Sequence, residues 1–170
     1  MKTTVMHSYL NNTENKWPKE LQNDNFKIII DADSSPVVYE TIKVAAQHDI
    51  PVYLVKDYAH HTTSDYGENV TTMYVDTASD SADYKIAALI QENDIVVTGD
   101  YGLASIVLHK ARAIHHTGFL YSAQNIDTLL LTRHIHHESR KRNKRVKGPS
   151  KFTEMDRKQF IKSLEQLIKA

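Results

Sequence analysis

Cysteine is absent from the sequence, and glycine, proline and tryptophan are scarce, with five, four and one residues. The lack of cysteine excludes disulfide bonds, thiolate metal ligands and a cysteine nucleophile. No apolar run approaches the roughly 18 residues that a membrane-spanning helix needs, and the first residues lack the apolar core of a signal peptide. We therefore expect a cytoplasmic protein with no membrane contact.

An excess of charge of one sign is also lacking, because 21 Lys/Arg balance 21 Asp/Glu. The balance hides a segregation: residues 133–170 hold 12 Lys/Arg against 4 Asp/Glu, whereas the preceding 132 residues hold 9 against 17. An acid-rich part joined to a basic one favours metal chemistry beside a surface that binds a polyanion. A soluble surface whose charges happen to segregate explains the same counts equally well.

Size and patterning predict a single α/β domain. The hydrophobic content of 41% and the charged content of 25% are ordinary for a globular protein. Residues 1–25 are polar and lack a sustained period, which predicts a flexible extension. Over residues 26–170, short apolar runs alternate with helical patterns, which predicts a mainly parallel sheet of about 4–5 strands flanked by helices. Residues 133–151 are predicted to be a basic linker, and residues 153–169 a C-terminal amphipathic helix capped by Thr153.

The most informative stretch is residues 26–37, Phe-Lys-Ile-Ile-Ile-Asp-Ala-Asp-Ser-Ser-Pro-Val. Its three isoleucines predict a buried strand, and Asp31 and Asp33 follow where that strand ends. Ligands of open α/β sheets bind beyond the carboxyl ends of the strands, and two carboxylates there repel each other unless a cation or a shared proton intervenes. Capping of the next helix by Asp33, Ser34 or Ser35 is the alternative; it explains one polar residue well, but Asp31 less well.

Two further strand-to-helix junctions also carry acids. Asp80 and Asp83 lie three residues apart at the start of a predicted helix, and Asp100 ends the strand that contains Val-Val-Thr-Gly. Asp80 and Asp100 could each simply cap a helix. Because parallel strands bring such junctions to one edge, we expect these acids to form one pocket with Asp31. An all-oxygen ligand set suits Mg²⁺ or Mn²⁺, and one or two such ions could support hydrolysis of a phosphodiester.

Several ordered motifs resemble the YaiI/YqxD family of bacterial proteins, and the resemblance covers about residues 26–168. The motifs are Asp-Ala-Asp-x-x-Pro-Val at 31–37, Asp-x-x-Asp at 80–83, Val-Thr-Gly-Asp-x-x-Leu-Ala at 97–104, Gly-x-x-Tyr-x-x-x-Asn-Ile at 118–126 and Gly-Pro-x-x-Phe-x-x-x-Asp-Arg-x-x-Phe at 148–160. The sequence departs from the family at Ser34-Ser35, where many members carry Ala-Cys. It also departs at His115-His116-Thr117, where Asn-Pro-Arg is usual.

That family is similar to PIN-like nuclease domains, so the resemblance implies a three-layer α/β/α fold, acidic metal ligands and RNase activity. It makes Asp31, Asp80, Asp83 and Asp100 the catalytic and metal-binding set, with Asp33 in support. The second departure removes an arginine that would bind phosphate, which affects the expected handling of substrate more than the metal site.

Substrate-binding side chains are predicted beside the pocket and in the basic stretch. They are Ser34, Ser35 and His116 and, as an arm along the phosphate backbone, Arg140, Arg142, Lys144, Arg145 and Lys147. Together these features predict a hydrolase: a nuclease that depends on Mg²⁺ or Mn²⁺ and acts on nucleic acid, RNA more than DNA. A homo-oligomer is compatible with the same patterns.

Two other functions stay open. Asp31-Ala-Asp33 after an apolar strand also resembles haloacid-dehalogenase phosphatases, in which the first aspartate is a nucleophile and the second an acid/base. Against that reading, no convincing lysine-bearing motif follows, and the chain leaves no room for a substrate cap. The third hypothesis is a non-catalytic module that binds RNA or a nucleotide. It predicts salt-dependent RNA binding that survives Asp31→Asn and Asp100→Asn.

Overall fold

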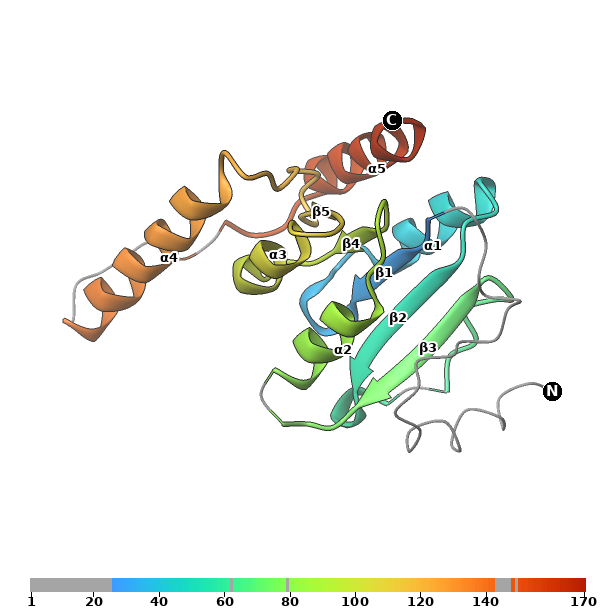
Figure 1. Cartoon of the computed structure of the whole chain (residues 1–170), viewed down its shortest axis with the longest axis horizontal. Coiled ribbons are helices and arrows are strands. Elements are labelled where there is room, and N and C mark those ends of the chain that lie inside the picture. The colour runs from blue at the N-terminus through green and yellow to red at the C-terminus, as the bar shows by residue number, and fades with distance from the viewer. Residues whose placement is uncertain (1–25, 62, 79, 143–147, 149) are drawn as a thin grey trace.

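Five short strands form one parallel sheet in the order β3-β2-β1-β4-β5 (Figure 1). The computed structural model describes residues 26–170 except 62, 79, 143–147 and 149. The strands are β1 (Ile28–Asp31), β2 (Val52–Asp57), β3 (Val70–Val75), β4 (Ile95–Val97) and β5 (Arg112–Ile114). All four pairings between neighbours are parallel, which confirms the predicted sheet.

The central strand explains why the sheet is covered on both faces. Successive side chains of a strand point to opposite faces, and Ile28, Ile29 and Ile30 of β1 are all fully buried. Ile28 and Ile30 pack with Phe160 and Leu164 in one core cluster, whereas Ile29 belongs to the other cluster. An uninterrupted apolar run is therefore what a strand with two buried faces needs.

Helices form a layer on each face of the sheet. The helices α1 (Val38–Gln47) and α5 (Glu154–Lys169) supply the cluster that contains Ile28. The helices α2 (Ser81–Leu89) and α3 (Tyr101–Val107), with the start of α4 (Ile126–Lys141), supply the other. The predicted three-layer α/β/α architecture is thus confirmed, and its strands all end at one rim of the sheet (Figure 1).

The helix α4 corrects the predicted linker over residues 133–151. It continues to Lys141, so the first nine of those residues are helical. Arginine, lysine and glutamate are good helix formers, and no glycine or proline lies between Ile126 and Gly148. Lys141 also forms an ion pair with Glu138, one turn earlier, at 3.4 Å. The helix projects away from the sheet (Figure 1).

Two further expectations concern residues 1–25 and contact with a membrane. The proposed N-terminal extension over residues 1–25 lies outside the described residues. Among the helices that are described, none combines the length and the apolar character needed to cross a membrane.

Candidate functional site

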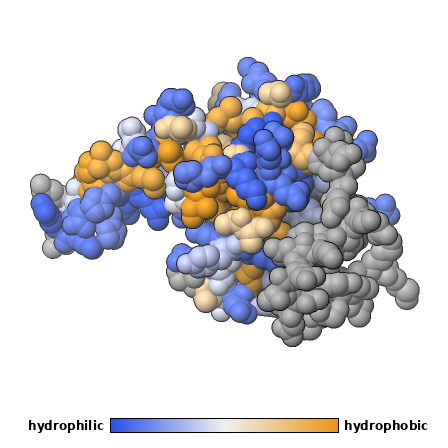
Figure 2. Space-filling model, in the orientation of Figure 1, coloured by the Kyte–Doolittle hydropathy of each residue, from blue (hydrophilic) through white to orange (hydrophobic). Residues whose placement is uncertain are grey.

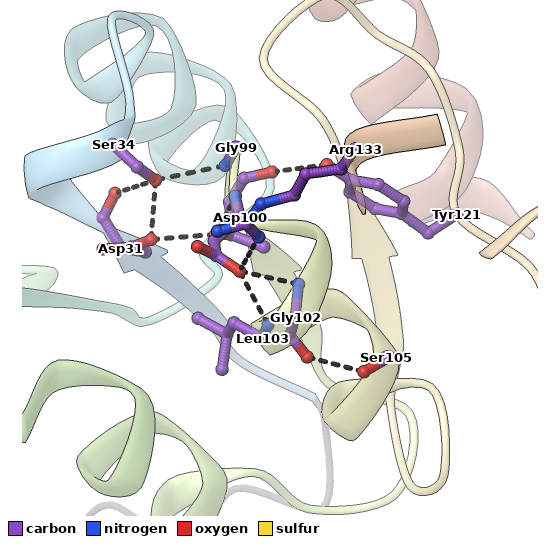
Figure 3. Close-up of polar contacts among 10 residues, drawn as sticks. Asp31, Ser34, Gly99, Asp100, Gly102, Leu103, Ser105, Tyr121 and Arg133 are labelled. Atoms are coloured by element: carbon purple, nitrogen blue, oxygen red, sulfur yellow. Dashed lines mark hydrogen bonds and ion pairs between the residues drawn. The ribbon is translucent and has the colours of Figure 1, made fainter. Parts of the chain in front are cut away.

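Asp31, the last residue of β1, is the buried centre of the site. The register that pairs Ile30 with Val97 brings Asp31 beside Thr98, whose hydroxyl donates to Asp31 Oδ2 at 2.8 Å. The hydroxyl of Ser34 donates to the same oxygen at 2.6 Å (Figure 3). The residue is only 6% exposed, and burial raises the pKa of its carboxyl group despite the two hydrogen bonds.

Asp100 lies across the rim from Asp31 and caps α3. Its Oδ1 accepts hydrogen bonds from the backbone N–H groups of Gly102 at 2.6 Å and Leu103 at 3.1 Å (Figure 3). The capping role considered from the sequence is therefore confirmed. The carboxylate also affects Asp31 electrostatically, because Asp100 contributes to the raised pKa of Asp31.

Asp83, in the first turn of α2, reports how close the acids lie. Its pKa is raised to about 6, first by burial and then by the negative charges of Asp100, Asp31 and Asp80. Asp80 precedes the helix in a left-handed conformation with φ of 65° and makes no capping hydrogen bond through its side chain. Asp31, Asp80 and Asp100 thus each lie within electrostatic range of Asp83, and we call these four residues the carboxylate rim.

Asp33 was predicted to support the carboxylate rim; its negative charge contributes to the raised pKa of Asp31, and its carboxylate oxygens contact two further residues. It lies in the single turn η3 (Ala32–Ser34), and its Oδ2 accepts the backbone N–H of Asp57 at 2.9 Å. Its Oδ1 lies 3.3 Å from Nδ1 of His60, which belongs to the turn η4 (Tyr58–His60). Of the acidic, histidine and cysteine side chains in the described parts of the chain, only Asp33, Asp57 and His60 bring three ligand atoms within 4.8 Å of one another.

The predicted substrate-binding residues near the rim have structural partners of their own. The Ser34 hydroxyl links the two junctions, since it donates to Asp31 and accepts the Gly99 N–H at 3.1 Å. Ser35 Oγ accepts the N–H of Val37 at 3.4 Å, just before α1. The ring of His116 packs against that of Phe152, with the two ring centroids 5.6 Å apart. The buried Nδ1 of His116 has no hydrogen-bond partner among the described residues.

The basic arm is only partly described. Arg140 and Arg142 lie at the exposed end of α4, and Arg140 Nε donates to the carbonyl of His136 at 3.3 Å. The other predicted members, Lys144, Arg145 and Lys147, lie outside the described residues. The two described members of the arm, Arg140 and Arg142, therefore lie at the C-terminal end of α4 and not in the carboxylate rim.

Arg133 and Thr98 belong to the site although the sequence analysis did not select them. Arg133 Nη1 of α4 lies 3.5 Å from Asp100 Oδ1 (Figure 3), and its charge also lowers the pKa of Asp83. Thr98 donates to Asp31 and accepts the N–H of Asp100 at 3.0 Å, so it connects both carboxylates. Its position directly before Gly99-Asp100 was the available signal, whereas no local pattern distinguishes Arg133 on a basic helix.

Fold and site together define a three-layer α/β/α protein with a carboxylate cluster at the carboxyl ends of its parallel strands. The chain belongs to the family described as uncharacterized BCR, YaiI/YqxD, which matches residues 29–170. It is 42% identical over 144 residues to a UPF0178 protein of Enterococcus faecalis, which covers 84% of this chain and 97% of the relative. It is 43% identical over 143 residues to UPF0178 proteins of Bacillus thuringiensis subsp. konkukian and Oceanobacillus iheyensis, with 84% and 98% covered in each case.

No solved structure matches the chain at a significant level. The expected similarity to PIN-like nuclease domains therefore stays a prediction, while membership of the YaiI/YqxD family is confirmed.

Proposed function

We propose that this protein is a divalent-metal-dependent phosphodiesterase that cleaves RNA at the carboxylate rim. The observation that carries the proposal is that acids from three separate strand–helix junctions lie at one edge of the sheet, within electrostatic range of Asp83. Bringing negative charges together costs free energy unless something offsets their repulsion. Asp100 also caps α3, but capping does not account for Asp31 or Asp83, and a bound cation would offset the repulsion among all three carboxylates.

The residues of the carboxylate rim fit Mg²⁺ or Mn²⁺. Every candidate ligand is a carboxylate oxygen, which hard cations prefer. Mg²⁺ usually keeps several water ligands and uses only one or two carboxylates directly, so the acids need not converge as tightly as a closed cage requires. When bound, such an ion lowers the pKa of a water molecule and offsets the charge on a leaving oxygen.

The other groups of the rim have roles that follow from their contacts. Hydrogen bonds from Ser34 and Thr98 fix Asp31, and two backbone N–H groups fix Asp100, so both carboxylates are held in place before a ligand arrives. Asp83, partly buried in the first turn of α2, would provide a further carboxylate oxygen for the ion. Arg133 provides a guanidinium group beside Asp100 that can bind a phosphate through two parallel hydrogen bonds.

The preference for RNA over DNA follows from the resemblance to PIN-like nuclease domains. The described positive charges that support a nucleic-acid substrate are Arg133 at the rim and Arg140 and Arg142 further along α4. A phosphatase with Asp31 as the nucleophile fits less well, because Asp31 is only 6% exposed and its Oδ2 already accepts two hydroxyl groups.

The test is cleavage of single-stranded RNA by the purified protein with Mn²⁺. We expect cleavage that EDTA abolishes and that Asp100→Asn slows by about 100-fold or more, since one charged group of a preorganised site is lost. Asparagine caps helices as well as aspartate does, so the variant should stay folded. Glu92→Gln is the control, because Glu92 is exposed in the turn before β4, at the other end of the strands.

Three results would contradict the proposal. The first is no cleavage by the wild-type protein, and the second is cleavage that Asp100→Asn leaves unchanged. The third is a phosphoryl group trapped on Asp31, which would identify the phosphatase instead. RNA binding without cleavage, unchanged in Asp31→Asn and Asp100→Asn, would identify the non-catalytic module.

A further inference from the structure

A second group of potential metal ligands lies beside the carboxylate rim, at the ends of β1 and β2. It consists of Asp33 in η3, Asp57 as the last residue of β2, and His60 in η4. His60 Nδ1 lies 2.8 Å from Asp57 Oδ1 and 3.3 Å from Asp33 Oδ1. Two ligands bound to one ion at about 2.1 Å, at angles between about 90° and 109°, lie about 3.0–3.4 Å apart. The contact with Asp33 has this spacing, and the shorter contact with Asp57, a hydrogen bond in the absence of an ion, has to lengthen slightly to admit one.

Backbone hydrogen bonds hold the two carboxylates in these positions. The N–H of Asp57 donates to Asp33 Oδ2 at 2.9 Å, and this contact leaves Asp33 Oδ1 directed toward His60. The N–H of His60 donates to Asp57 Oδ1 at 3.0 Å. Such supporting contacts orient ligands in metal sites, and here they fix the two carboxylates at the ends of β1 and β2.

Space for further ligands adjoins the group. A hollow of about 340 Å³ is lined by Ala32, Asp33, Lys56, His60 and His61. About a quarter of each aspartate side chain remains exposed, so water can reach the carboxylate oxygens. The ammonium group of Lys56 donates to the hydroxyl of Tyr66 at 2.9 Å.

We propose that Asp33, Asp57 and His60 bind a divalent transition-metal ion such as Zn²⁺, Co²⁺ or Mn²⁺ at a site separate from the carboxylate rim. A set of two carboxylates and one imidazole nitrogen suits these ions, whereas Mg²⁺ favours oxygen ligands alone. Three protein ligands leave one or more coordination positions open toward the hollow, as in metal sites that also bind water or a substrate atom. The site does not depend on the proposed nuclease activity, because Asp57 and His60 are not part of the carboxylate rim.

The experiment measures metal binding without any enzymatic readout. Isothermal titration with Zn²⁺ and visible absorption with Co²⁺ are carried out on the Asp100→Asn protein, which removes one ligand of the carboxylate rim. We expect one Zn²⁺ site and a Co²⁺ absorption band. We further expect that adding His60→Gln weakens the affinity at least about tenfold, no less than the loss of a supporting residue does.

His61→Gln is the matched control, because His61 is the next residue and lines the same hollow without belonging to the group. Asp57→Asn provides a second test, since its amide oxygen can still accept the N–H of His60 and only the charge is lost. Equal Zn²⁺ affinities for His60→Gln and His61→Gln would overturn the proposal and leave a hydrogen-bonded group only. If the Asp100→Asn protein loses RNA cleavage but still binds Zn²⁺, metal binding by Asp33, Asp57 and His60 is independent of the carboxylate rim.

Discussion

At the scale of single residues, the half-buried His115 makes the fold sensitive to acid. Burial, followed by the neighbouring His116, lowers the pKa of His115 to about 4, and Asp156 partly opposes this shift. Between that value and the ordinary histidine pKa of about 6.5, the unfolded chain binds the proton that the folded protein does not. The free energy of unfolding therefore decreases as the pH falls from about 6.5 toward 4.

We predict that His115→Asn makes this loss of stability smaller. The amide oxygen of asparagine can replace His115 Nδ1 as acceptor for the N–H of Thr117. The side chain at position 115 then no longer binds a proton in this pH range. Urea unfolding followed by circular dichroism at about pH 7.5 and about pH 4.5 measures the effect. The exposed His109→Asn controls for the loss of an imidazole, and a wild-type pH dependence in His115→Asn would contradict the assignment.

The residues of the carboxylate rim could be predicted because one rule applies to all of them. An acid at a strand-to-helix junction of a parallel sheet reaches the same edge as its counterparts, and this rule selected Asp31, Asp80, Asp83 and Asp100. Asp57 also ends a strand, but in the sequence it reads as the start of a polar loop. The pair His60-His61 was interpreted as surface or loop histidines, because the turn η4, which brings His60 back to Asp57, has no apolar period to mark it.

At the scale of elements, the turn that ends in Gly118 lies directly against α5. Gly118 has φ of +85°, and a Cβ atom there would lie 2.8 Å from the backbone carbonyl group of Gln159. Neither backbone can move without disturbing the contact between the turn after β5 and α5. Glycine is therefore required both for the conformation and for the close approach.

We predict that Gly118→Ala destabilises the protein more than Gly67→Ala does. Both glycines have positive φ, so both variants suffer a strain of about 1–2 kcal/mol. A Cβ at Gly67 meets only Asn69 Oδ1 at 3.8 Å, whereas the collision at Gly118 adds about 1–3 kcal/mol. Chemical denaturation of the two variants measures the difference, and equal losses of stability would show that the contact with α5 yields at little cost.

The elements were predictable where local chemistry determined them. Isoleucine and valine runs marked β1 and β4, and β-branched, aromatic and other apolar residues marked β2 and β3. Thr153 marked the start of α5, where its side chain accepts the N–H of Asp156 in a capping box. The end of α4 was not predictable from apolar periodicity, because beyond Leu130 its side chains are mostly exposed. Helix propensity and charge pairing extend it instead.

At the scale of the whole molecule, α4 connects the carboxylate rim to the basic segment. Figure 2 shows hydrophilic and hydrophobic side chains side by side on its projecting part, where Leu131 and Ile135 are 58% and 52% exposed. Arg133 and Arg140 are seven residues apart, which places them on nearly the same side of the helix and about 10 Å apart along its axis. The segregation of charge in the sequence thus becomes a line of positive groups that leads away from the acids.

That arrangement predicts how binding of RNA depends on salt. In the Asp100→Asn protein, which binds without rapid cleavage if the proposed function holds, Arg140→Gln should weaken binding of single-stranded RNA. It should also reduce the slope of log affinity against log salt concentration by roughly 0.7, the value for one lost phosphate contact. Fluorescence anisotropy at several salt concentrations measures the slope. Lys158→Gln, an exposed charge on α5, is the control for net charge: if it changes the slope as much as Arg140→Gln does, α4 is not the path of the RNA.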